Sequence, residues 1–184
     1  MKLLLSIIIY TLIYQLTLSK MEVILGNIYC WFESLFGQNL AEYLWGYNCE
    51  TQVYSGKNLF NSIGLITLGV SLVFVFAYYY LPLFFFNHPR TNRWWNWLML
   101  LFIAGIVNFV IGYAWTINDF LNGNIGDCLM YYRDSDGNII SNLIYKRDCW
   151  LFGLSNFFIS SMFFIFWSII FKWWSRNCKH SPCF

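Results

Sequence analysis

Three asparagines stand in otherwise apolar stretches of the chain, and each is accompanied by small residues at helical spacing. In LFIAGIVNFVIGYAW, Asn108 follows Gly105 by three residues and precedes Gly112 by four. Residues three, four and seven apart lie on one face of an α-helix. The polar and small residues with this spacing are Asn61, Gly64, Ser71, Gly105, Asn108, Gly112, Gly153, Asn156 and Ser160.

Such amide-bearing faces can do one of two things in a membrane. Small residues let helix backbones approach, and an interhelical hydrogen bond contributes about 0.6–2 kcal/mol, so the faces can serve as packing seams. Alternatively, amides from several subunits can line a narrow pore without fixed charge. The apolar stretches contain no Asp, Glu, His, Lys or Arg, which ion and proton pathways normally use. We therefore favour packing seams and keep an oligomeric channel as the alternative.

The cysteines are the second set of side chains that could take part in a chemical reaction or a crosslink. Four of the six lie in two more polar segments, Cys30 and Cys49 in residues 20–58 and Cys128 and Cys149 in residues 118–149. In an oxidising compartment they would form two structural disulfides. The simplest pairing joins the two cysteines within each segment, although three connectivities are open. The tail sequence NCKHSPCF holds only three soft ligands where structural zinc needs four, so we expect no metal or other cofactor.

The amino-acid composition indicates whether these residues lie in water or in a membrane. The chain is 59% hydrophobic and 11% charged, with a mean hydropathy of +0.51, which is far more apolar than a soluble domain. A membrane-spanning helix needs about 17–25 apolar residues. Residues 59–81, 94–117 and 150–171 meet this length. Residues 3–18 form a shorter fourth candidate, which we interpret as a retained helix rather than a cleaved signal peptide, because QLTLSKME offers no small-x-small cleavage site. We expect a single all-α membrane domain, a four-helix transmembrane bundle.

Charge predicts how this bundle is oriented. Lys and Arg beside a span are retained on the cytoplasmic side. The expected inner turn, residues 82–93, and the tail, residues 172–184, contain no acid, while all nine acids fall in the segments 20–58 and 118–149. The cations of the turn and tail are Arg90, Arg93, Lys172, Arg176 and Lys179. Both termini are therefore expected in the cytoplasm, and the membrane is taken to be a bacterial inner (plasma) membrane.

The two outer segments are expected to form a small cap. In CLMYYRDSDGNIISNLIYKRDC, Asp136-Gly137 separates two runs rich in Tyr and Ile, which predicts a β-hairpin. In SLFGQNLAEYLWGY, Leu35, Leu40, Leu44 and Tyr47 fall near one face of an amphipathic helix, which is expected to lie flat on the outer membrane surface or to pack over the bundle. Together with the disulfides, these elements predict a disulfide-braced outer cap that contains a β-hairpin.

The topology itself resembles a known family. Four spans, internal termini and two cysteines in each outer segment are similar to the DsbB family of membrane thiol oxidases, and this resemblance implies thiol-disulfide oxidoreductase activity. The first outer loop of that family carries a C-x-x-C pair, whereas eighteen residues separate Cys30 from Cys49. The resemblance is therefore confined to topology, and no functional residue is carried over.

These observations predict a non-enzymatic protein. The sequence contains no phosphate-binding glycine loop after a strand, no zinc-protease motif and no known motif of a serine or cysteine nucleophile. We expect a homo-oligomeric scaffold or sensor that contacts membrane lipid, binds no nucleic acid and recruits an acidic, soluble cytoplasmic protein through the basic inner face. The alternatives are a small channel and a DsbB-like thiol-disulfide enzyme.

Overall fold

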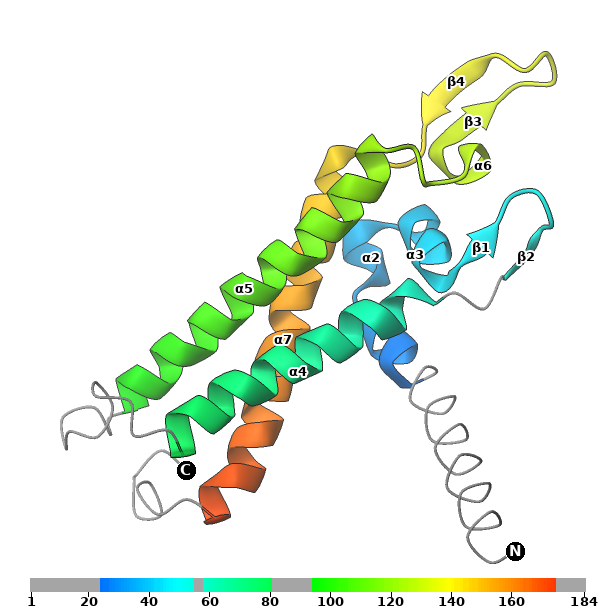
Figure 1. Ribbon diagram of the computed structural model, residues 1–184. Coiled ribbons are helices and arrows are strands. Elements are labelled where there is room, and N and C mark those ends of the chain that lie inside the picture. The colour runs from blue at the N-terminus through cyan, green and yellow to red at the C-terminus, as the bar shows by residue number, and fades with distance from the viewer. Residues whose placement is uncertain (1–23, 55–57, 81–93, 175–184) are drawn as a thin grey trace, which may run out of the picture.

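Three long helices dominate the computed structural model, which describes residues 24–54, 58–80 and 94–174 (Figure 1). They are α4 (Leu59–Tyr80), α5 (Trp94–Leu121) and α7 (Lys146–Trp174). Each is long and apolar enough to cross a membrane, as expected of an integral membrane protein. The fourth expected span, residues 3–18, lies outside the described residues. The structure therefore supports three spans of the four-helix bundle.

Two of the helices extend further than hydropathy predicts. The span expected at 94–117 continues to Leu121, and the span expected at 150–171 begins at Lys146. At the start of α7, the Tyr145 backbone N–H donates to the Asp148 carboxylate at 2.8 Å, which satisfies one of the free donors at a helix start. Local capping therefore allows the helix to begin among charged residues, and the outer segment is correspondingly shorter than 118–149.

The end of α5 is also capped by its own backbone. Gly123 has a φ of 68°, and the Asn124 N–H donates back to the Asp119 carbonyl at 3.0 Å. This is the arrangement in which a residue in the left-handed conformation closes a helix, and glycine adopts it without steric cost. The helix thus ends at a sequence signal, Asn-Gly, rather than where the apolar run ends.

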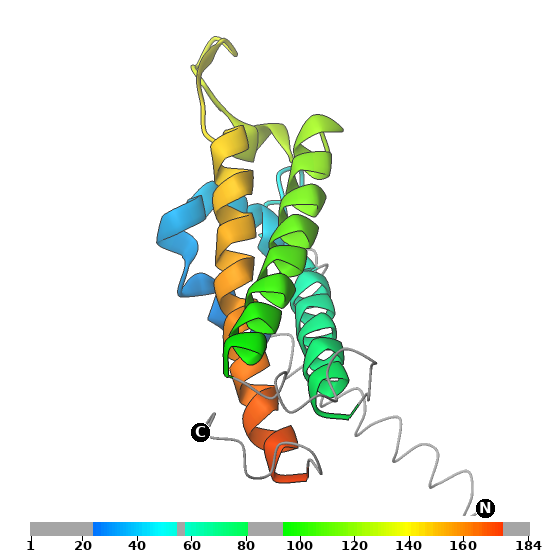
Figure 2. The same ribbon diagram turned by 90° about the vertical axis from the view of Figure 1, so that its left-hand side faces the viewer.

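The helices α5 and α7 approach each other closely, and Figure 2 shows them side by side with α4. A β-carbon at Gly153 would lie 3.1 Å from the carbonyl oxygen of Phe109 and 3.0 Å from the β-carbon of Tyr113. A β-carbon at Gly112 would lie 3.0 Å from the side-chain nitrogen of Asn156. Glycine at these positions lets the two backbones come together.

A cap of short elements lies at one end of the bundle, and we use this name for residues 33–54 and 122–145. Its first part contains α2 (Glu33–Phe36), α3 (Gln38–Trp45), β1 (Tyr47–Asn48) and β2 (Val53–Tyr54), and its second part contains α6 (Asp127–Met130), β3 (Tyr131–Arg133) and β4 (Ile139–Asn142). The strands β3 and β4 pair antiparallel, which confirms the predicted hairpin. Figure 1 shows this hairpin projecting away from the helices.

The cap is joined to the bundle by a shared apolar core. Tyr29, in the helical residues 24–30, stacks on Phe60 of α4 and Phe152 of α7 with ring centroids 5.1 Å and 5.7 Å apart. Phe36 of α2 contacts the same Phe152 ring at 5.3 Å, and Leu40 of α3 is buried in the same cluster. Because aromatic side chains bury large apolar areas, this cluster couples the cap mechanically to the spans.

Candidate functional site

A buried hydrogen-bond network runs through the centre of the bundle. Its hub is Asn156 of α7, whose side-chain oxygen accepts hydrogen bonds from the hydroxyls of Tyr29 at 2.5 Å and Thr67 at 2.9 Å. The side-chain nitrogen of Asn156 donates to the backbone carbonyl of Asn108 at 2.6 Å. One amide therefore connects α4, α5, α7 and the helical residues 24–30.

A second layer of the network lies one turn further along α7. The side-chain nitrogen of Asn108 donates to the hydroxyl of Ser160 at 2.7 Å and to the carbonyl of Ala104 at 2.9 Å. The hydroxyls of Ser160 and Ser71 are 3.0 Å apart, which links α7 to α4. Asn108, Asn156 and Ser160 have no exposed surface, so these bonds are shielded from competing donors and acceptors.

The seam residues named from sequence are divided between this network and the helix contacts. Ser71, Asn108, Asn156 and Ser160 make the interhelical hydrogen bonds above. A β-carbon at Gly105 or Gly112 would meet α7 side chains, one at Gly153 would meet α5, and one at Gly64 would meet Tyr29 and Leu25. Asn61 is buried at the start of α4, where its backbone N–H bonds the side chain of Asn58 at 3.2 Å. The hydrogen bonds of the network thus lie within one subunit.

Sequence inspection missed two members of the network. Thr67 lies three residues after Gly64 and four before Ser71, so the helical spacing was visible for this residue. Tyr29 carries no comparable signal, because it lies outside the spans and reaches Asn156 only through the packing of residues 24–30 on α4 and α7.

The cysteine pairing differs from expectation. The structure joins Cys49 to Cys128, with the two α-carbons 5.8 Å apart, so the expected pairs Cys30–Cys49 and Cys128–Cys149 are wrong. Cys149 is buried in the first turns of α7 and Cys30 is partly buried, and both are free thiols. The disulfide connects the two outer segments to each other because α3 packs beside α6. The cap is therefore held together by one crosslink between its halves rather than by two local loops.

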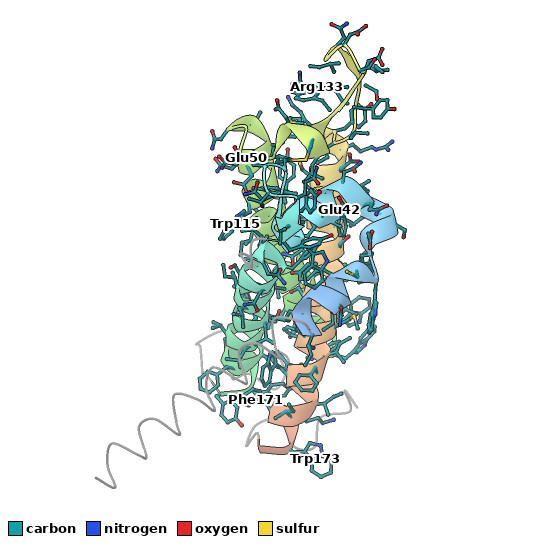
Figure 3. The ribbon with its side chains drawn as sticks, turned by 90° about the vertical axis from the view of Figure 1, so that its right-hand side faces the viewer. Glu42, Glu50, Trp115, Arg133, Phe171 and Trp173 are labelled. Carbon is teal, nitrogen blue, oxygen red and sulfur yellow. A yellow bond between two sulfur atoms is a disulfide. The ribbon has the colours of Figure 1, made fainter. Side chains whose placement is uncertain are left out.

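The described acids are confined to one end of the molecule. Figure 3 shows Glu42, Glu50 and Arg133 at the cap end and Phe171 and Trp173 at the opposite end. Every acid among the described residues lies in the cap or in the adjoining turns of α5 and α7: Glu33, Glu42, Glu50, Asp119, Asp127, Asp134, Asp136 and Asp148.

The opposite end, which we call the distal end, contains the last residues of α4 and α7 and the start of α5. Lys172 lies there, in the last turn of α7. The other basic residues proposed for docking, Arg90, Arg93, Arg176 and Lys179, lie outside the described residues. Arg93 directly precedes α5 in sequence, and Arg176 follows the last residue of α7 by two positions. In sequence, these cations therefore adjoin the elements that form the distal end.

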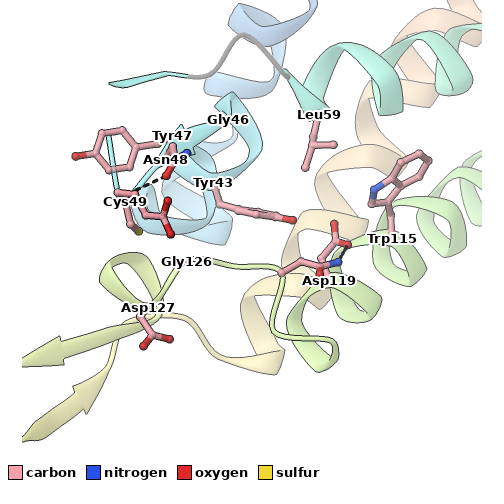
Figure 4. Close-up of a pocket in the computed structure, with 12 residues that line it drawn as sticks. Tyr43, Gly46, Tyr47, Asn48, Cys49, Leu59, Trp115, Asp119, Gly126 and Asp127 are labelled. Atoms are coloured by element: carbon pink, nitrogen blue, oxygen red, sulfur yellow. Dashed lines mark hydrogen bonds between the residues drawn. The ribbon is translucent and has the colours of Figure 1, made fainter. Parts of the chain in front are cut away.

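A pocket of about 790 Å³ opens between the two halves of the cap and the adjoining ends of α4 and α5 (Figure 4). Asp119 of α5 is 8% exposed, and its carboxylate accepts a hydrogen bond from the Asn124 side chain at 3.0 Å. The lining residues are Tyr43, Gly46, Tyr47, Asn48, Cys49, Glu50, Leu59, Trp115, Asp119, Asn124, Gly126 and Asp127. No sequence motif predicts this pocket, because its lining residues come from α3, the turn after β1, the start of α4, the end of α5 and the loop before α6.

The chemistry of the pocket is acidic and aromatic. Burial raises the pKa of Tyr43 above its ordinary value, and the negative charge and hydrogen bonding of the nearby Asp119 carboxylate raise it further. Figure 4 shows the Tyr43 hydroxyl directed toward Asp119. Among the described residues, no three His, Cys, Asp or Glu side chains are grouped closely enough to hold a metal ion.

Comparison with protein-family models, with curated proteins and with solved structures finds no match for this chain.

Proposed function

We propose that this protein is a non-enzymatic membrane scaffold or sensor, with the cap outside the cell membrane and the distal end in the cytoplasm. The basic distal end recruits a soluble protein with an acidic surface. The observation that carries this proposal is the separation of charge along the bundle. The described acids cluster at the cap end, and the cations of the expected inner turn and tail adjoin the helices of the other end in sequence.

The connection between the two ends supports a sensing role. The helices α5 and α7 run without interruption from the cap to the distal end. Their contact is fixed by the Asn156–Asn108 and Asn108–Ser160 hydrogen bonds and by the glycine seam. A change in the cap would therefore be transmitted as a movement of whole helices, because packed interiors rearrange as units rather than deforming gradually.

The channel alternative has less support from the geometry. The side chains of Asn108 and Asn156 are wholly buried and point to partners in the same subunit. An amide that lines a pore must instead face water or a permeating ion. Homo-oligomerisation remains part of the proposal, through lipid-facing surfaces rather than through these amides.

The thiol-disulfide alternative also has less support. Its chemistry uses a closely spaced redox pair, and Cys49 is bonded to Cys128, which lies 79 positions away and in the other half of the cap. This disulfide has the position of a structural brace between two segments.

Affinity purification from native membranes in mild detergent tests the recruitment. Reversing charge with Arg90→Glu, Arg93→Glu and Arg176→Glu in one chain should abolish co-purification of the acidic partner, because the basic surface that attracts it becomes acidic. The matched control is Lys146→Glu with Arg147→Glu. It reverses charge at the cap end, where acidic residues also favour the start of α7.

The control should retain the partner at the wild-type level. Co-purification that is unchanged in the triple variant would refute docking through the basic end. Because cations also set membrane orientation, the orientation of each variant is measured in the same preparation by the labelling experiment described in the Discussion.

A further inference from the structure

The pocket in the cap has the dimensions of a site for a small molecule. Its volume of about 790 Å³ lies within the roughly 300–1,000 Å³ typical of ligand pockets. Leu59 is the first residue of α4, and Trp115 lies two turns before the end of α5. The pocket therefore sits where the spans enter the cap, so that an occupant would contact both parts of the molecule.

The charge of the pocket is one-sided. Three carboxylate residues line it, Glu50, Asp119 and Asp127, and the described residues of its lining include no Lys, Arg or His. Asp127 already has a cationic partner, because Arg133 lies 2.9 Å from its carboxylate. The lining carboxylates of Glu50 and Asp119 have no ion pair within the described residues.

Asp119 is the residue that most requires a countercharge. More than nine tenths of its surface is buried, yet in the described part of the chain it interacts with neutral groups, the amide of Asn124 and the hydroxyl of Tyr43. A buried carboxylate is costly unless a cation compensates its charge. A positively charged ligand would supply that compensation, and Figure 4 shows the carboxylate on the pocket side of α5.

The remaining walls select an organic cation rather than a metal ion. Calcium takes six to eight oxygen ligands, and the described acids form no group of three that could share one ion. The aromatic rings of Tyr43, Tyr47 and Trp115 line the same pocket, together with the apolar side chain of Leu59. Aromatic faces attract ammonium and related cations, and the attraction strengthens where water is excluded.

We infer that the cap pocket binds a small organic ammonium compound, with its charged group beside Asp119 and Glu50 and its apolar body against Trp115 and Leu59. This site does not depend on recruitment of a cytoplasmic partner, although it would give the proposed sensor its input. An occupant of the site would contact both halves of the cap and the ends of α4 and α5, so its binding energy would depend on how these parts are placed.

The test is a calorimetric titration of the full chain, purified in detergent without any partner. Three probes share one ring and differ in charge at neutral pH: benzylammonium, benzyl alcohol and benzoate. Benzylammonium should bind at least tenfold more tightly than benzyl alcohol, because only the cation compensates Asp119, and benzoate should not bind. Equal binding of benzyl alcohol and benzylammonium would overturn the proposal.

Two substitutions test whether benzylammonium binds beside Asp119. Asp119→Asn keeps the shape and the acceptor for Asn124 but removes the charge, so it should weaken benzylammonium binding at least tenfold. Asp134→Asn is the matched control, because it removes the same charge from the exposed tip of the β3–β4 hairpin, outside the pocket. It should bind like the wild type.

Glu50→Gln gives an independent measurement should Asp119→Asn fail to fold, because Glu50 is exposed and its removal leaves the core intact. It should weaken benzylammonium binding several-fold. Wild-type affinity in folded Asp119→Asn, or in Glu50→Gln where the first variant does not fold, would refute the site. Because the purified chain is titrated alone, a failure here leaves the recruitment proposal standing, and a failed co-purification leaves this site standing.

Discussion

Asn156 donates its side-chain N–H to the backbone carbonyl of Asn108 across 2.6 Å, near the middle of the bundle. The same amide accepts two hydroxyl hydrogen bonds on its other side, so both of its polar atoms are used. An amide that is satisfied in this way stabilises one arrangement of the helices, because any rotation of α7 would leave buried donors without acceptors. Its role is therefore structural, and it defines the register of three helices at once.

Replacing this hub should destabilise the whole bundle. In Asn156→Leu, the hydroxyls of Tyr29 and Thr67 lose their shared acceptor and the Asn108 carbonyl loses a donor. At about 0.6–1.7 kcal/mol for each of these three intramembrane hydrogen bonds, the free energy of unfolding should fall by about 2–5 kcal/mol. Denaturant titration in detergent, followed by helical circular dichroism, measures the change.

The control for this variant is Ser161→Ala. Ser161 lies on the same helix, but its hydroxyl bonds only the Phe157 carbonyl of its own helix, so the expected loss is below 0.5 kcal/mol. Equal stabilities of the two variants would show that the network contributes nothing to folding.

The glycine seam makes a second prediction about stability. A β-carbon at Gly153 would be 3.1 Å from the Phe109 carbonyl oxygen, a backbone atom that cannot move without shifting α5. Gly153→Ala should therefore cost about 1–3 kcal/mol, as other overpacked interiors do.

Gly69→Ala is the matched control for the seam. Gly69 lies in the middle of α4. In the described part of the chain, no atom other than those of its chain neighbours and the nearby backbone of its own helix lies within 4 Å of a β-carbon built there. Alanine at this position should be neutral or stabilising by up to about 1 kcal/mol, because it favours the helix without a clash. The two thermal melting temperatures, measured in the same detergent, should move in opposite directions or by clearly different amounts.

The crosslink between the two halves of the cap makes a third prediction. Mass spectrometry of the unreduced, digested protein should recover one peptide pair that contains Cys49 and Cys128. Cys49→Ser should lower the free energy of unfolding by about 2–4 kcal/mol, because the crosslink restricts the unfolded cap. Replacing Cys30 and Cys149 by Ser should leave the crosslinked peptide unchanged. A Cys128–Cys149 peptide from the wild type would show that the disulfide connectivity of the cap is different.

The sequence predicted the parts of the fold that depend on local pattern. Hydropathy located α4, α5 and α7, and Asp136-Gly137 located the β3–β4 hairpin. The helix predicted from sequence in the first outer segment was wrong, because a single backbone angle decides the structure there. The amphipathic pattern around Leu40 predicted one helix, but Gly37 has a φ of 88° and separates α2 from α3, which leaves Leu35 exposed.

The candidate sites were less predictable, because they depend on contacts between distant segments. Cys49 meets Cys128 only when α3 lies beside α6, and spacing along the chain favours the shorter loops that the structure does not use. The span expected from hydropathy ends at residue 117, which puts Asp119 in the expected outer segment 118–149. Its burial follows from the unexpected extension of α5 to Leu121, so its relation to Tyr43 could not be derived from hydropathy.

The orientation of the bundle makes the last prediction, and the proposed function depends on it. The exposed turn between β3 and β4 carries Ser135, and the tail beyond α7 carries Cys178. In a chain that retains only Cys49 and Cys128, Ser135→Cys should react with a membrane-impermeant maleimide in intact cells, because the acid-rich cap is expected outside. With Cys178 restored instead, labelling should require permeabilised cells. The reverse pattern would place the basic end outside, where it could not recruit a cytoplasmic protein.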